Sequence, residues 1–177
     1  MNLPNKLTML RVILIPVFLL VLFLAPSPIN RYISVAIFMI ASLTDFLDGH
    51  LARKWNLVSN FGKFMDPLAD KLLVMAALVS MVQLGDLASW VVIIILAREF
   101  AITGFRTLAM EANIVMAASW WGKVKTTVQM IMIIVVLLDL PFVGISVVED
   151  ILIGLAVFFT ILSGGDYIIK NKQVLKG

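Results

Sequence analysis

The chain has 177 residues, of which 62% are hydrophobic and only 14% are charged, and its mean hydropathy is +1.06. Soluble domains average about 45–50% apolar and about 25% charged residues, so this composition excludes an ordinary soluble protein and predicts an integral membrane protein. The absence of cysteine and the presence of one histidine, His50, exclude disulfides, thiolate chemistry and a histidine-rich metal site. The net charge of +3 is small, and no nucleic acid partner is expected.

Six apolar runs predict six transmembrane helices, and therefore an all-α, polytopic membrane fold. The runs fall at about residues 7–24, 32–47, 68–84, 89–110, 124–140 and 151–169. A span takes about 20 residues, so six spans use about two-thirds of the chain. We therefore expect a single transmembrane domain over residues 1–177, with no appended soluble domain.

The basic residues predict the orientation of these helices in the membrane. Thirteen of the fourteen Lys and Arg residues lie at one set of helix ends, together with both termini, and only Arg31 lies at the opposite ends. By the positive-inside rule, the thirteen basic residues and both termini face the cytoplasm.

Charged residues also continue from the cytoplasmic ends into the apolar segments themselves. A charge at mid-bilayer costs about 2.5–3.5 kcal/mol on insertion scales, so such residues usually face a partner or a water-filled cavity. The pattern therefore predicts a polar chamber open to the cytoplasm. The residues concerned are Asp45, Asp48, Asp66, Asp70, Arg98 and Arg106.

The four aspartates form two pairs with helical spacing. Asp45 and Asp48 stand three residues apart, and Asp66 and Asp70 stand four residues apart, so each pair shares one face of its helix. Two neighbouring helices can therefore direct four carboxylates at one point. These anions repel one another strongly unless cations lie among them. Oxygen-only ligands suit hard ions, and the pattern predicts one or two Mg²⁺ or Mn²⁺ ions.

A divalent metal beside a lipid-facing chamber indicates phosphoryl or phosphatidyl transfer at the membrane surface. Arg53 is placed to bind phosphate oxygens, while Gly49 and Gly62 let a ligand lie against the helix backbone. Taken singly, some of these residues also have a structural explanation. Asp66 before Pro67, for example, is typical of a helix N-cap followed by proline at the first helical position.

The combined pattern D-x2-D-G-x2-A-R-x8-G-x3-D-x3-D resembles the signature of the CDP-alcohol phosphotransferases. It is matched by Asp45, Asp48, Gly49, Ala52, Arg53, Gly62, Asp66 and Asp70. The resemblance implies six transmembrane helices, a homodimer in the lipid bilayer, two metal ions per site, and transfer of a phosphatidyl group from CDP-diacylglycerol to an alcohol with release of CMP.

The same resemblance implies a role for each of the eight residues. Three of the aspartates, Asp45, Asp48 and Asp66, would be metal ligands. Asp70 would complete the second metal site and act as the catalytic general base that takes the proton of the acceptor hydroxyl. The remaining residues would line the CDP site: Gly49, Ala52, Arg53 and Gly62.

The N-terminal stretch Asn5-Lys-Leu-Thr8-Met-Leu-Arg11 resembles the phosphatidylglycerophosphate synthases of that family. The spacing puts the three polar side chains near one stripe of a helix, where they can bond to the cytidine diphosphate. A capped helix start with a cytoplasmic arginine explains the same three residues equally well.

Four basic residues further along the chain concern the acceptor alcohol. Arg98 and Arg106 lie eight residues apart, about 80° on a helix wheel, and Lys123 and Lys125 reach the same cytoplasmic edge. These cations suit an acceptor that itself carries phosphate. The positive-inside rule also explains both lysines, and Arg98 has a structural alternative in pairing with Glu99 or with a chamber aspartate.

The stretches Ala97-Arg-Glu-Phe and Trp121-Gly-Lys-Val-Lys-Thr-Thr are similar to those of bacterial phosphatidylglycerophosphate synthases. This likeness implies sn-glycerol 3-phosphate as the acceptor and a multi-pass enzyme of the bacterial inner membrane with a cytoplasmic active site. A synthase that uses inositol phosphate is the alternative within the family. A small ion-coupled transporter is the alternative from a different class.

Overall fold

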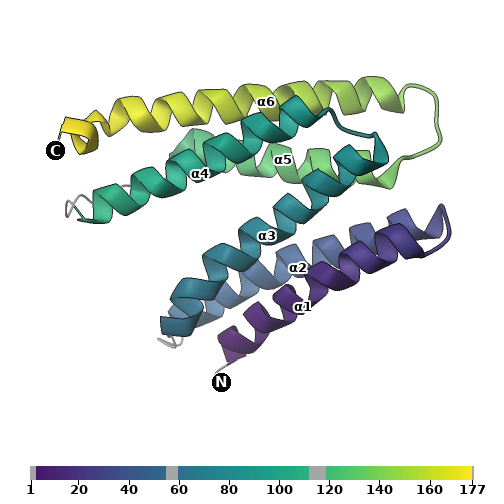
Figure 1. The fold of residues 1–177 in the computed structure, drawn as a ribbon, viewed down its shortest axis with the longest axis horizontal. Coiled ribbons are helices and arrows are strands. Elements are labelled where there is room, and N and C mark those ends of the chain that lie inside the picture. The colour runs from purple at the N-terminus through teal and green to yellow at the C-terminus, as the bar shows by residue number, and fades with distance from the viewer. Residues whose placement is uncertain (1–2, 55–59, 112–118, 177) are drawn as a thin grey trace. The chain divides into compact units, whose positions relative to one another are not determined.

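The computed structural model describes residues 3–54, 60–111 and 119–176, and in these ranges the chain forms helices and no strand (Figure 1). The side chains of residues 3–4, 45–54, 60–61, 63–64, 67 and 175–176 lie outside the description. The predicted number and order of the long helices are confirmed. The elements are α1 (Leu3–Leu24), α2 (Ile29–Lys54), α3 (Asn60–Leu84), α4 (Ser89–Glu111), α5 (Trp120–Leu138), α6 (Ile145–Lys170) and the short 3-10 helix η1 (Lys172–Lys176).

Three stretches of the described helices are long and apolar enough to cross a membrane: Asn5–Leu24, Trp120–Leu138 and Ile145–Lys170. A shorter apolar stretch, Ile29–Thr44, lies in α2. The other helices carry charged residues within their apolar sequence, as α4 does with Arg98, Glu99 and Arg106. The chain is therefore an all-α membrane protein, and charges reduce the apolar length of some of its helices.

The starts of α3 and α6 differ most from the predicted ones. α3 begins at Asn60 rather than at residue 68, because hydropathy locates the continuous apolar part of a helix and misses first turns of mixed polarity. α6 begins at Ile145 rather than at residue 151, directly after Gly144, whose φ of 90° ends the preceding loop in the left-handed region that favours glycine. The predicted polar connection before this span is therefore partly helical.

The chain divides into two compact units, Met1–Gln83 and Leu84–Gly177. In the first unit, α1 and α2 form an antiparallel hairpin and pack along each other (Figure 1). Phe18 of α1 and Phe38 of α2 are completely buried, and their ring centroids lie 6.4 Å apart. Leu22 and Ala41 are buried in the same helices. This apolar packing fixes the two helices whose polar ends carry several of the predicted site residues.

In the second unit, α6 packs against both α5 and α4. The ring of Trp121 on α5 stacks against the ring of Phe159 on α6, with the ring centroids 6.1 Å apart. Between α4 and α6, Ile102, Phe105 and Tyr167 form a small buried cluster. The last helix therefore supports the two helices that carry all four predicted acceptor-site cations.

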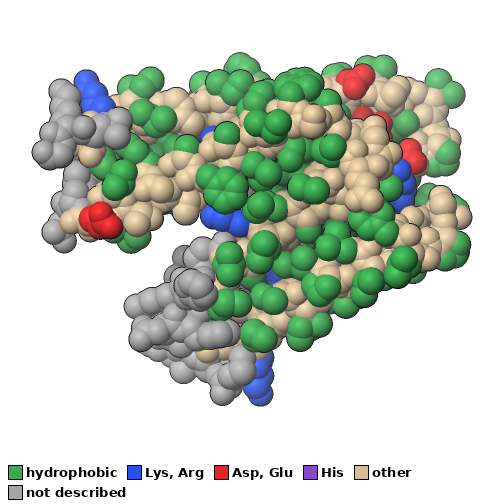
Figure 2. Space-filling view, viewed as in Figure 1, with side chains coloured by type: hydrophobic (Ala, Val, Ile, Leu, Met, Phe, Trp, Pro, Cys, Tyr) green, Lys and Arg blue, Asp and Glu red, His purple; other side chains and the backbone are tan. Residues whose placement is uncertain are grey.

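Large apolar side chains cover much of the surface, as Figure 2 shows for the face in view. Soluble monomers rarely expose extended apolar patches, whereas lipid-facing helices do so along their length. The exposed residues include Ile13, Leu20, Ile40, Leu43, Ile93, Phe158 and Ile161.

Candidate functional site

The polar residues at the start of α1 face the interior of the first unit. Asn5 is 8% exposed, Thr8 is 1% exposed and Arg11 is completely buried. The Nε atom of Arg11 donates a hydrogen bond to the carbonyl oxygen of Ala41 on α2, at 3.3 Å. A buried charge needs partners of this kind, so Arg11 is an interior residue and more than a topology signal. Its binding to a nucleotide stays a prediction.

Thr8 connects α1 to the predicted metal ligand Asp66 on α3. The threonine hydroxyl donates a hydrogen bond to Oδ1 of Asp66 at 2.6 Å, across 58 residues of sequence. Thr8 is buried while Asp66 is half-buried. The bond fixes the orientation of this carboxylate and gives Thr8 a role in the site that the sequence did not assign to it.

The structure places Asp66 and Asp70 one turn apart inside α3, with the side chain of Asp70 exposed. Because α3 already begins at Asn60, Asp66 is not an N-cap, and that alternative is wrong. The side chains of Asp45 and Asp48 lie outside the described residues, although the α2 backbone is helical at both positions. Among the described side chains, no group of three potential metal ligands occurs.

The predicted CDP-site residues are only partly covered by the structure. Gly62 lies in the first turn of α3 and is buried. The surroundings of Gly49, Ala52 and Arg53 lie outside the described residues, and all three positions belong to the helical backbone of α2. Their contribution to a nucleotide site stays a prediction.

Two of the predicted acceptor-site cations meet at one carboxylate. Glu99 Oε1 accepts a hydrogen bond from Nη1 of Arg98 at 3.1 Å and also pairs with Nζ of Lys125 on α5. The side chain of Lys125 is only 4% exposed. The pairing of Arg98 with Glu99, foreseen as an alternative, is confirmed. One anion therefore holds two largely buried cations from different helices.

The other two predicted cations have different surroundings. Arg106 donates a hydrogen bond from Nε to the Tyr167 hydroxyl at 2.7 Å, and its guanidinium carbon lies 5.3 Å from the centre of that ring. Tyr167 is buried on α6, so it supports Arg106 from a rigid element. Lys123 is exposed on α5. Glu99 thus brings Arg98 and Lys125 together, whereas Arg106 bonds to Tyr167.

A further polar contact joins the start of α5 to α6. Ser119 donates a hydrogen bond to Oδ2 of Asp166 at 2.6 Å, and Lys170 pairs with Oδ1 of the same residue at 2.7 Å. Sequence reasoning missed both Asp166 and Tyr167, and treated the final segment as a plain span with a basic tail. The available signal was an acidic residue within an apolar helix, which usually has a partner.

The Glu99 cluster gives a prediction about stability. Glu99→Gln keeps the size of the side chain but removes the negative charge shared by Arg98 and Lys125. Because charge-assisted hydrogen bonds contribute about 1.5–3 kcal/mol each, we expect the free energy of unfolding to fall by about 2 kcal/mol. Thermal unfolding in detergent measures this, with the exposed Glu111→Gln on the same helix as the matched control. Equal melting temperatures for the two variants would contradict the prediction.

Known proteins resemble this chain over nearly its whole length. The model of the CDP-alcohol phosphatidyltransferase family matches residues 1–162. A Bacillus subtilis protein named CDP-diacylglycerol–glycerol-3-phosphate 3-phosphatidyltransferase is 46% identical, over 99% of this chain and 97% of its own length. A Mycobacterium tuberculosis protein named probable phosphatidylglycerophosphate synthase is 42% identical, over 99% of this chain and 84% of its own length. A Rickettsia bellii protein, also named CDP-diacylglycerol–glycerol-3-phosphate 3-phosphatidyltransferase, is 37% identical, over 97% of this chain and 96% of its own length. This chain belongs to the CDP-alcohol phosphatidyltransferase family.

Proposed function

We propose that this protein transfers the phosphatidyl group of CDP-diacylglycerol to sn-glycerol 3-phosphate, producing phosphatidylglycerophosphate and CMP. The observation that carries the proposal is the 46% identity, over almost the full length of both chains, to a Bacillus subtilis protein named for this reaction. Membership of a transferase family argues against the ion-coupled transporter considered from the sequence. The proposal further places the enzyme in the bacterial inner membrane as a homodimer, with its termini and active site on the cytoplasmic side.

The nucleotide half of the reaction belongs to the first unit of the chain. Asn5, Thr8 and Arg11 form a buried polar stripe on α1, and Thr8 bonds directly to Asp66. In the proposal, this stripe binds the cytidine diphosphate together with Gly49, Ala52, Arg53 and Gly62. Hydrogen-bond donors on a rigid helix suit a diphosphate, because little conformational freedom is lost when it binds.

The carboxylates fit a pair of hard divalent cations, Mg²⁺ or Mn²⁺. Asp45 and Asp48 stand one turn apart on the helical backbone of α2, and Asp66 and Asp70 one turn apart on α3, so both helices carry oxygen-only ligands at suitable spacing. Such ions would neutralise the charge that develops on the departing CMP. The bond from Thr8 leaves the second carboxylate oxygen of Asp66 for this purpose.

Asp70 is the proposed general base. It takes the proton from the 1-hydroxyl of glycerol 3-phosphate, and that oxygen attacks the β-phosphorus of CDP-diacylglycerol in line. The new phosphorus–oxygen bond forms as the bond to the bridging oxygen breaks, and CMP leaves with that oxygen. The exposed position of the Asp70 side chain suits a group that must reach a substrate hydroxyl.

The acceptor's phosphate is assigned to the basic residues of the second unit. Arg98 and Lys125 are held at Glu99, and Arg106 is held by Tyr167, so these cations are positioned before any substrate binds. Preorganised cations bind an anion better than mobile ones, because fewer side chains must be ordered on binding. Lys123 adds an exposed ammonium group on α5. A phosphate-bearing alcohol fits this arrangement, whereas serine would not need it.

A single assay tests the proposal. Purified protein in detergent is given CDP-diacylglycerol and Mg²⁺, and CMP release is compared for glycerol 3-phosphate, inositol phosphate, serine and no acceptor. We expect release with glycerol 3-phosphate alone. Release with inositol phosphate instead would keep the reaction class but overturn the acceptor. A folded sample that releases no CMP with any acceptor would overturn the transferase function itself.

A further inference from the structure

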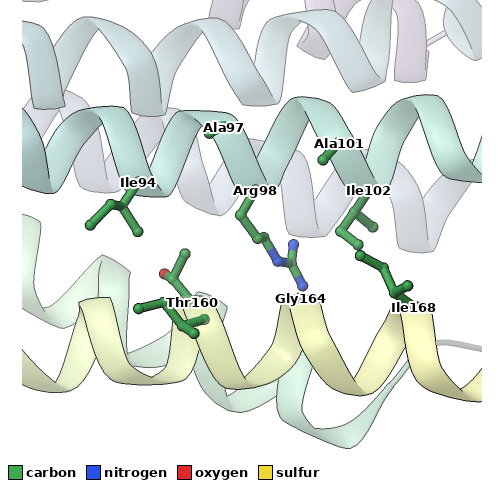
Figure 3. A pocket seen from close by; sticks show the side chains of 9 residues that line it. Ile94, Ala97, Arg98, Ala101, Ile102, Thr160, Gly164 and Ile168 are labelled. Atoms are coloured by element: carbon green, nitrogen blue, oxygen red, sulfur yellow. The ribbon is translucent and has the colours of Figure 1, made fainter.

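The side chain of Arg98 crosses from α4 to α6 through a largely apolar groove. The groove has a volume of about 370 Å³, and its lining includes Ile94, Ala101 and Ile168. Figure 3 shows Arg98 extending from α4 toward the turn of α6 that carries Gly164. A guanidinium in such surroundings is costly unless the protein holds it in place. The contacts of the Arg98 side chain therefore show what holds its guanidinium in place.

Two glycines make room for Arg98. A Cβ atom added at Gly164 would lie 3.3 Å from Cγ of Arg98, which is tighter than an ordinary contact between carbon atoms. A Cβ atom added at Gly122, at the start of α5, would lie 3.7 Å from Nη2 of the same arginine. The adjacent Gly165 has no such neighbour within 4 Å. The stem of Arg98 thus lies close to the α6 backbone at Gly164, and Gly165 has no comparable contact.

One hydrogen-bond donor of the Arg98 guanidinium group has no partner among the described residues. Nη1 bonds to Glu99, whereas Nε is buried and has no hydrogen-bond partner among the described residues. Most buried donors form a hydrogen bond, so a buried donor without a protein partner suggests that water or a ligand binds there. An anion that reached this group would supply the missing acceptor.

From these contacts we propose that Gly164 is a positioning residue, whose missing side chain lets Arg98 lie in the place from which it binds the acceptor's phosphate. The inference rests on the proposed function. Any side chain at residue 164 must displace Cγ of Arg98, and the displacement is passed along the rest of the side chain to the guanidinium. Misplacement of a binding group by about 1 Å can cost up to about 100-fold in an enzyme, so a local clash has a measurable effect.

Neighbouring glycines on α6 provide a matched test. Gly164→Leu fills the space of the Arg98 stem, while Gly165→Leu makes the same change one residue along, where nothing lies within 4 Å. We expect Gly164→Leu to raise the KM for glycerol 3-phosphate by about tenfold, equivalent to about 1.4 kcal/mol, with the KM for CDP-diacylglycerol within about twofold of wild type. Gly165→Leu should leave both values within about twofold.

The smaller change Gly164→Ala covers the case in which Gly164→Leu does not fold. It should raise the same KM by about threefold, even though alanine favours the helix and should not lower the melting temperature. Arg98→Ala removes the binding group itself, so it should give the largest rise in the KM for glycerol 3-phosphate. Equal acceptor KM values for the variants at 164 and 165, or an equal rise for both substrates, would overturn the positioning role. A wild-type protein that ignores glycerol 3-phosphate would overturn the proposed function, and with it the acceptor role of Arg98.

Discussion

Replacing Asp70 by asparagine is expected to lower kcat for CMP release by about 10²–10⁴-fold, the range typical for loss of a general base. Asparagine has nearly the same size and retains one acceptor oxygen, but it cannot take a proton from the acceptor hydroxyl at neutral pH. The KM for CDP-diacylglycerol should change by less than about threefold, because the buried polar stripe on α1 is untouched. Steady-state kinetics with each substrate varied in turn measure both quantities.

Asp150→Asn is the matched control, since Asp150 is an exposed aspartate near the start of α6, and its kcat should equal that of wild type. Asp66→Asn distinguishes the base from a metal ligand: Asp66 is a proposed ligand whose carboxylate is oriented by a hydrogen bond from Thr8, so this variant should need a higher Mg²⁺ concentration for activity. If Asp70→Asn retains more than about a tenth of wild-type kcat, another group takes the proton and the assignment of the base is wrong.

Hydropathy and charge spacing were sufficient to predict the helices but not their polar ends. The apolar runs identify six helices in the right order because lipid-facing segments need about 20 apolar residues. The first two turns of α3, residues 60–67, interrupt their few apolar residues with Gly62, Asp66, Pro67 and other polar residues, so no continuous apolar run marks them. The error mattered, because it made Asp66 look like a helix cap when it lies inside the helix.

The contacts that organise the site were beyond the reach of sequence reasoning for a different reason. Thr8 and Asp66 are 58 residues apart, and Arg106 and Tyr167 are 61 residues apart, so only tertiary packing brings each pair together. The sequence did identify the chemistry of the candidate residues through their charge and spacing. It could not show that Glu99 is shared by two cations, because that depends on how α5 packs in the second unit.

Removal of divalent cations is expected to abolish CMP release entirely and to lower the melting temperature of the protein. The activity is lost because charge on the departing CMP is no longer neutralised. Stability falls because ions that bind only the folded protein stabilise it, by about 2.7 kcal/mol at a concentration 100 times the Kd. Without them, the carboxylates on α2 and α3 repel one another if they converge as proposed. Chelation followed by titration with Mg²⁺ or Mn²⁺ measures both effects in one sample.

The dependence of melting temperature on Mg²⁺ locates the ions as well as detecting them. Asp45→Asn, Asp48→Asn and Asp66→Asn should each reduce the stabilisation by Mg²⁺, because each removes one anionic ligand from the proposed site. Asp150→Asn should keep the full stabilisation, since Asp150 lies outside the carboxylate pattern. Equal stabilisation of all four variants would place the ions elsewhere. CMP release that persists in excess chelator would show that the two aspartate pairs serve a reaction without metal.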